Sequence, residues 1–177
     1  MPQSACWNAF THEDLATLAG KGHKAVAWQD PTPLSDRDGF ANPSCGADWH
    51  DTTIAAVVIE ARDEKFRQTK TTAESTGWEP ARPAPLDFGP GAQGWLFHEG
   101  TVQLLVRCDV LDKDGRPPVF PYRMVNVTGD LGAADAPAAK VHQIRVDAAL
   151  SVAKELVRAQ GCTNAPQLAA RPPAAPF

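Results

Sequence analysis

The feature that most constrains the fold of this chain is the stretch 93–127, where three apolar segments follow one another at short intervals. In the middle segment, 101–110, apolar side chains alternate with polar ones, and only Leu105 breaks the pattern. The alternating apolar residues are Val102, Leu104, Val106, Cys108 and Val110. A period of two with β-branched residues predicts a strand whose sheet has one buried face. With the flanking segments 94–98 and 119–127, we expect three consecutive strands.

Two further strands are expected at residues 24–29 and 52–62. The segment 52–62 is apolar on both of its faces, which predicts an interior strand covered on both sides. Thr11, followed three residues later by Asp14, approximates a capping box and predicts a helix over 12–19.

The strongest helical pattern covers residues 138–160, where one polar stripe lies opposite an apolar face and Gly161 provides the stop. Residues 64–69 favour a helical turn. Residues 165–177 are rich in Ala and Pro without periodicity, which predicts a tail or linker that contributes little to the fold.

The fold class that these segments predict is a single α+β domain over residues 1–164. We expect a mainly antiparallel sheet of about five strands, packed against the long C-terminal helix and held by two disulfides. The helix 12–19 is expected at an edge of this sheet or on its other face.

The four cysteines, Cys6, Cys45, Cys108 and Cys162, are widely spaced and include no C-x-x-C pair. Such spacing is poor for a zinc or redox motif and suits two long-range disulfides in an extracytoplasmic protein. The alternative is four buried free thiols in a cytosolic protein. The first six residues show no charged or apolar region of a signal peptide, so export would mean that a leader has been removed.

The expected topology favours one pairing of these cysteines. Cys108 lies near the end of its strand, on the apolar face. A helix over 138–160 spans about 33 Å, close to the length of a ten-residue strand. It therefore returns Cys162 to the height of Cys108, and Cys6 with Cys45 remains by elimination. The other two connectivities stay open.

Composition argues against several classes of function. The formal net charge of −4 lacks the basic footprint of a nucleic-acid-binding protein. No apolar run approaches the roughly 20 residues of a membrane span. A phosphate-binding loop, a dinucleotide fingerprint and a G-x-S-x-G elbow are all missing from the sequence, so no cofactor and no catalytic residue are predicted.

Polar clusters leave one enzymatic alternative, a small extracellular hydrolase or metal-dependent enzyme. That alternative requires two of the residues His50, Asp51, His98 and Glu99 to converge in a cleft. These residues lie in short polar stretches without the i, i+4 spacing of metal ligands, so solvated surface side chains are the simpler interpretation and no metal is predicted.

Large aromatic side chains mark a candidate contact surface. Trp78 and Phe88 lie in a Pro-rich loop, where a ring either seals the core or belongs to an exposed patch. With Phe40 in the loop 30–43, and with Trp49, they predict a contact with another protein or with a cell-envelope ligand.

The N-terminal part, Ala5-Cys-Trp with Thr11, Asp14-Leu and Leu18, followed by a Pro-rich loop and Cys45-x3-Trp49, resembles the opening of small actinobacterial exported lipoproteins of unknown function. In these proteins a Cys precedes a short helix and pairs with a Cys near a Trp-bearing strand. The strand ending in Arg-Cys and the Ala-rich helix ending in Gly-Cys are similar to related actinobacterial cell-surface proteins. The resemblance covers about a third of the chain, which differs in having Cys162 after the last helix instead of before it. It implies an exported, surface-held protein without an established activity.

Taken together, these features favour an exported, non-enzymatic binding or interaction domain, secreted or at the cell surface. Besides the enzymatic alternative, a structural subunit of a multi-protein assembly is a third possibility, in which the loop 78–91 is buried by a partner.

Overall fold

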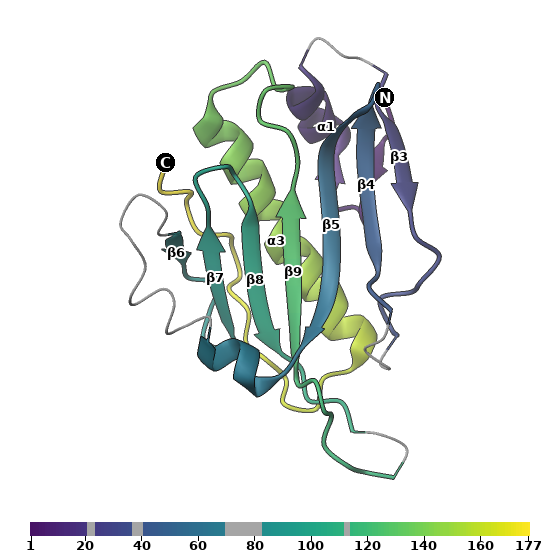
Figure 1. Ribbon diagram of the computed structural model, residues 1–177, viewed down its shortest axis with the longest axis vertical. Coiled ribbons are helices and arrows are strands. Elements are labelled where there is room, and N and C mark those ends of the chain that lie inside the picture. Colours follow the sequence, from purple (N-terminus) through teal and green to yellow (C-terminus); the bar gives the residue numbers. More distant parts are fainter. Residues whose placement is uncertain (21–23, 37–40, 70–82, 112–113) are drawn as a thin grey trace.

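A computed structural model describes residues 1–20, 24–36, 41–69, 83–111 and 114–177. Seven strands form one antiparallel sheet in the order β3-β4-β5-β9-β8-β7-β6, and helix α3 crosses one face of it (Figure 1). Strands β1 and β2 form a separate two-stranded ribbon. The strands are β1 (Ser4–Ala5), β2 (Phe10–Thr11), β3 (Val26–Gln29), β4 (Ser44–Trp49), β5 (Thr52–Arg62), β6 (Ala84–Leu86), β7 (Ala92–Leu96), β8 (Val102–Arg107) and β9 (Tyr122–Thr128).

The predicted α+β class and the mainly antiparallel sheet are confirmed, but the sheet has seven strands instead of about five. The two additional strands are β4 and β6. Strand β4 consists mostly of small residues with an Asp, and β6 is Ala-Pro-Leu, so both have low strand propensity. Their neighbours in the sheet, and not their own side chains, make these segments extended.

The helices begin and end where the sequence predicts. Helix α1 (His12–Ala19) starts at Thr11, whose side chain accepts from the Asp14 amide while the Asp14 carboxylate accepts from the Thr11 amide. Helix α3 (Ala138–Gln160) ends at Gly161 in the left-handed conformation. Helix α1 packs against β5 and α3, so it lies on the same face of the sheet as α3, and its placement on the opposite face is wrong.

We call the side of the sheet under α3 the helix face and the other side the open face. The alternation predicted for β8 is confirmed, because Val102, Leu104 and Val106 are fully buried on the helix face. Leu105 points to the open face, where it joins a small apolar cluster. The buried members of this cluster are Trp95, Leu105, Tyr122 and Met124, with Phe66 and Phe97 packed against them.

Strand β5 is interior, as predicted, but its two faces are covered unequally. Val57 and Ile59 are buried on the helix face, whereas Ala56 and Val58 are only half-buried on the open face. The expectation that both sides of this strand are covered is therefore met on one side only.

Both predicted disulfides are present. Cys6 is bonded to Cys45 and Cys108 to Cys162, with Cα–Cα distances of 5.2 and 4.8 Å. Because α3 runs the length of the sheet, it carries Cys162 to the end of β8, which is the geometry that the predicted topology requires.

The C-terminal segment 165–177 is an integral part of the fold, and the prediction that it contributes little is wrong. Its backbone is held by contacts to α3 and to the loop before β7. The amide of Ala169 donates to the Phe88 carbonyl at 2.7 Å, and the side chain of Gln143 donates to Pro173 and accepts from Ala175. A proline-rich backbone makes no internal hydrogen bonds, so its carbonyl and amide groups can form hydrogen bonds with side chains of α3.

Candidate binding groove

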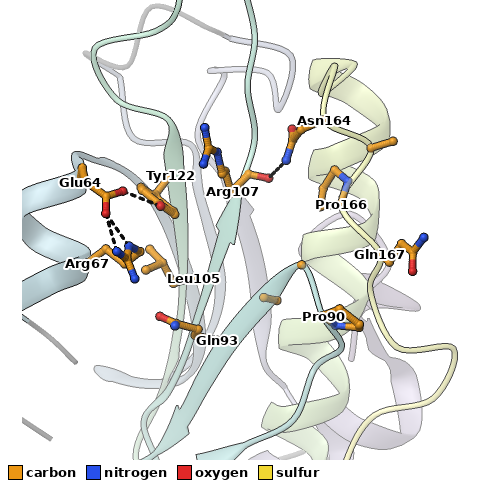
Figure 2. Close-up of a pocket in the computed structure, with 13 residues that line it drawn as sticks. Glu64, Arg67, Pro90, Gln93, Leu105, Arg107, Tyr122, Asn164, Pro166 and Gln167 are labelled. Atoms are coloured by element: carbon orange, nitrogen blue, oxygen red, sulfur yellow. Dashed lines mark hydrogen bonds and ion pairs between the residues drawn. The ribbon is translucent and has the colours of Figure 1, made fainter.

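A groove of about 670 Å³ lies on the open face, between the helical segment 64–69 and the C-terminal segment (Figure 2). Its floor is formed by parts of strands β7, β8 and β9. The lining residues are Glu64, Arg67, Pro90, Gly91, Ala92, Gln93, Leu105, Arg107, Tyr122, Asn164, Ala165, Pro166 and Gln167. We refer to this site as the groove.

One wall of the groove is a hydrogen-bonded network around Glu64. The Tyr122 hydroxyl donates to Glu64 Oε2 at 2.6 Å, and Arg67 Nε donates to Glu64 Oε1 at 2.8 Å (Figure 2). The hydrogen bond from Arg67, followed by that from Tyr122, lowers the pKa of Glu64 from 4.5 to about 2. Burial, together with the neighbouring carboxylate, raises the pKa of Tyr122. At neutral pH this wall therefore presents a neutral phenol beside a paired carboxylate and guanidinium.

The opposite wall is the start of the C-terminal segment. The Asn164 side chain donates to the Arg107 carbonyl at 3.0 Å and accepts from the Asp109 amide at 2.8 Å, as a further strand would. Further along, the Gly91 amide donates to the Gln167 carbonyl. A Cβ on Gly91 would lie 2.8 Å from the Gln167 nitrogen, so this wall approaches the sheet so closely that glycine is required.

Arg107 is the more accessible of the two groove arginines. Its side chain is 57% exposed, against 32% for Arg67. Its Nε donates to both carboxylate oxygens of Asp109, at 3.0 and 3.1 Å. These hydrogen bonds raise the pKa of Arg107, so the guanidinium stays charged.

The chemistry of the groove suits binding of a polar ligand. Guanidinium groups, a phenol and the amide of Gln93 surround the apolar floor at Leu105, and Pro90 and Pro166 are rigid parts of its rim. The side chain of Gln167 points away from the groove (Figure 2). The described lining residues include no His, Cys, Ser or Thr, and the one carboxylate among them, Glu64, is held by Arg67 and Tyr122. What this arrangement offers is hydrogen bonds and positive charge.

The aromatic residues predicted to form a contact patch do not gather in the groove. Phe88 is fully buried, and its ring takes the space that a side chain at Gly94 would need. The core-sealing interpretation therefore applies to Phe88, and its placement in a contact patch is wrong. Trp49 is half-buried with its ring against His50. Phe40 and Trp78 lie outside the described residues.

The residues of the enzymatic alternative lie in two separate hairpins. His50 and Asp51 are in the β4–β5 turn, and His98 and Glu99 are in the β7–β8 turn, with β9 between the two hairpins (Figure 1). The His98 ring stacks on Phe177 at 4.5 Å. Over the ranges that the structure describes, no three His, Cys, Asp or Glu side chains are grouped so that they could hold a metal ion.

Sequence reasoning did not find the groove because its residues come from distant segments. Asn164 and Gln167 lie in or beside the segment expected to be a loose tail, and Glu64 lies in a short helical turn. One sign was present in the sequence, namely Leu105 as an apolar residue on the polar side of its strand. An exception of this kind indicates that something covers that face locally.

Comparisons of the chain with protein-family models, with curated proteins and with solved structures find no match. Of the helices in the described part of the chain, none has the length and apolar character that crossing a membrane would need.

Proposed function

We propose that this protein is an exported, non-enzymatic binding domain that holds a polar ligand in the groove. The observation that carries the proposal is the contrast between a helix face sealed by α3 and an open face hollowed by a polar groove of about 670 Å³. A volume of this size is in the usual range of ligand sites, which hold their ligand with a few placed polar groups.

The two disulfides support the extracytoplasmic part of the proposal. Such bonds persist in oxidising compartments and are rare in the reducing cytosol. One joins the N-terminal ribbon to β4, and the other joins the end of α3 to the residue after β8. Both stabilise the scaffold on which the groove is built.

The polar groups of the groove define the class of ligand. Both groove arginines already have a carboxylate partner, Asp109 for Arg107 and Glu64 for Arg67, but the exposed terminal nitrogens of Arg107 still favour a carboxylate, which arginine binds through two parallel hydrogen bonds. The amide of Gln93 adds donors and an acceptor for a peptide or sugar backbone. We therefore propose a carboxylate-bearing molecule of the cell envelope, or a segment of another protein, as the ligand.

Export is tested by trapping thiols in the native host with an alkylating agent and mapping the peptides by mass spectrometry. We expect Cys6–Cys45 and Cys108–Cys162 to be found as disulfides, with the protein outside the cytoplasm after fractionation. Alkylated Cys108 and Cys162 in freshly trapped cells would contradict the proposal.

Binding is tested by NMR titration of backbone amides with short peptides that end in a free carboxylate, with the corresponding carboxamides and with neutral oligosaccharides. We expect saturable shifts at Gly91, Gln93 and Leu105 with the carboxylates and weaker shifts with the carboxamides. Gln93→Trp fills the groove from an exposed position and should abolish these shifts.

Gln103→Trp is the matched control for this titration, because Gln103 lies on an adjacent strand of the same face but outside the groove lining. It should leave the titration unchanged. Shifts that survive in Gln93→Trp, or that are missing with every probe, would show that the groove is not the binding site.

A further inference from the structure

The edge strand β3 is the most exposed strand of the sheet. All four of its residues are exposed, including Val26 at 68% and Trp28 at 38%. Among the described residues it pairs within the sheet with β4 alone, so it forms one edge of the sheet (Figure 1). An edge strand with apolar side chains and unpaired backbone groups is a template for another strand.

The register with β4 shows which backbone groups are available. The Asp30 amide donates to the Ser44 carbonyl at 2.8 Å, and in the same register Trp28 is opposite Gly46 and Val26 is opposite Asp48. In an antiparallel pair, hydrogen-bonded residues alternate with non-bonded ones. Within β3, the amides and carbonyls of the odd-numbered residues Ala27 and Gln29 are therefore directed away from the sheet.

The even-numbered side chains of this strand share the open face. The Trp28 ring lies over Gly46, where an added Cβ would be 2.6 Å from Trp28 Cζ2. Val26 lies on the same side. Asp30 continues the alternation, because its amide is bonded to Ser44, and the exposed Lys24 lies in a turn two residues before the strand. From residue 24 to residue 30 the even-numbered residues are thus a cation, two apolar residues and an anion.

This order is self-complementary in an antiparallel pair. We propose that β3 pairs with β3 of a second copy of this chain about a twofold axis at Ala27, which joins the two sheets into one. Ala27 then lies opposite Ala27 of the second copy, so that their outward-directed amides and carbonyls exchange hydrogen bonds, and Gln29 lies opposite Ala25, the residue before the strand. Val26 faces Trp28 of the second copy, and Lys24 faces Asp30.

The charges and the alternative registers favour this arrangement. Shifting the axis to Trp28 would keep the backbone pairing but place Val26 opposite Asp30 and leave Lys24 without its anion. Two hydrogen bonds from Thr32 lower the pKa of Asp30, so its carboxylate is charged at neutral pH. The opposite edge of the sheet is β6, a three-residue strand with Pro85, which is typical of an edge that does not pair.

The twofold axis in this register is perpendicular to the sheet, because residues opposite one another share a face. The two open faces, and with them the two grooves, therefore point the same way. A pair of chains would present both grooves to one surface, which increases the apparent affinity for a repeated ligand.

The test is sedimentation velocity on the whole chain from micromolar to millimolar concentration, with charge reversals at the strand ends. We expect the wild-type chain to form a dimer that strengthens with concentration. Lys24→Asp and Asp30→Lys should each weaken this dimer about tenfold or more, because like charges then face one another. An equimolar mixture of the two single variants should recover it, because an acidic side chain of one variant then faces a basic side chain of the other at both ends of the paired strands.

A backbone variant completes the test. Ala27→Pro removes an amide that is directed away from β4, so it should abolish the dimer while leaving the unfolding transition intact. A wild-type chain that stays monomeric over the whole range would overturn the proposal. Equal association of the wild-type chain, the single charge variants and their mixture would do the same.

Discussion

The two faces of the sheet are built from the same strands but are covered differently. On the helix face, Val102, Leu104, Val125 and Val127 are fully buried under α3. On the open face the same strands present Gln103, Arg107 and Asn126 beside a small apolar cluster. Period-two alternation makes this division possible, since each strand can contribute stability on one side and chemistry on the other. We therefore expect changes on the helix face to affect mainly the free energy of unfolding, and changes on the open face to affect mainly binding.

The largest loss of stability is expected on the helix face when the disulfide between β8 and α3 is removed. The bond closes a loop between residues 54 apart in sequence, and the chain-entropy estimate for such a loop is about 4 kcal/mol. The double variant Cys108→Ala/Cys162→Ala should lower the free energy of unfolding in guanidinium chloride by about this amount. An unchanged unfolding midpoint would show that packing alone holds α3 on the sheet.

A matched pair of leucines compares the two faces directly. Leu104 and Leu105 are neighbours in β8, are 0% and 2% exposed, and point to opposite faces. Leu104→Ala leaves a closed cavity under α3 and should lower the free energy of unfolding by about 3 kcal/mol. Leu105 borders the groove, where water and neighbouring side chains can fill the space left by a smaller side chain. We therefore expect Leu105→Ala to lower the free energy of unfolding by about 2 kcal/mol. Urea unfolding of both variants measures the difference, and an equal or larger loss for Leu105→Ala would remove the distinction between the faces.

A smaller effect is expected where the C-terminal segment forms a wall of the groove. Gly91→Ala would place a Cβ 2.8 Å from the Gln167 nitrogen and push this wall outward. We expect a loss of about 1–2 kcal/mol, together with faster hydrogen exchange at Ala169, whose amide is bonded to Phe88. Exchange at Val125, in the middle of the sheet, should stay slow, and unchanged exchange at Ala169 would contradict the close packing of this wall.

The helix face was predictable from the sequence and the open face was not. Alternation in β8, the capping box at Thr11 and the amphipathic pattern of 138–160 each depend on neighbouring residues. The strand and the long helix placed Cys108–Cys162 correctly, and Cys6–Cys45 followed by elimination. The groove depends on contacts between Glu64 and Tyr122 and between Asn164 and Arg107, which are 58 and 57 residues apart in the sequence. No local pattern encodes such pairs, and a segment rich in proline shows no periodicity even when it is held firmly by side chains of α3.

The smallest effect is a pH dependence confined to the open face. Because Arg67 and Tyr122 lower the pKa of Glu64 to about 2, from an ordinary 4.5, the folded chain favours the ionised carboxylate. The resulting stability is fully present above pH 4.5 and is lost as the pH falls toward 2. NMR titration of the Glu64 side-chain carboxyl should therefore show a midpoint near 2, and Tyr122→Phe should raise this midpoint by removing one donor while Arg67 remains. The Glu64→Gln variant has no carboxyl group to titrate at this position. The part of the acid-induced loss of stability that comes from protonation of Glu64 should therefore disappear. A midpoint near 4.5 in the folded wild-type chain would show that the Glu64 network does not persist in solution, and the groove would then lose one of its two walls.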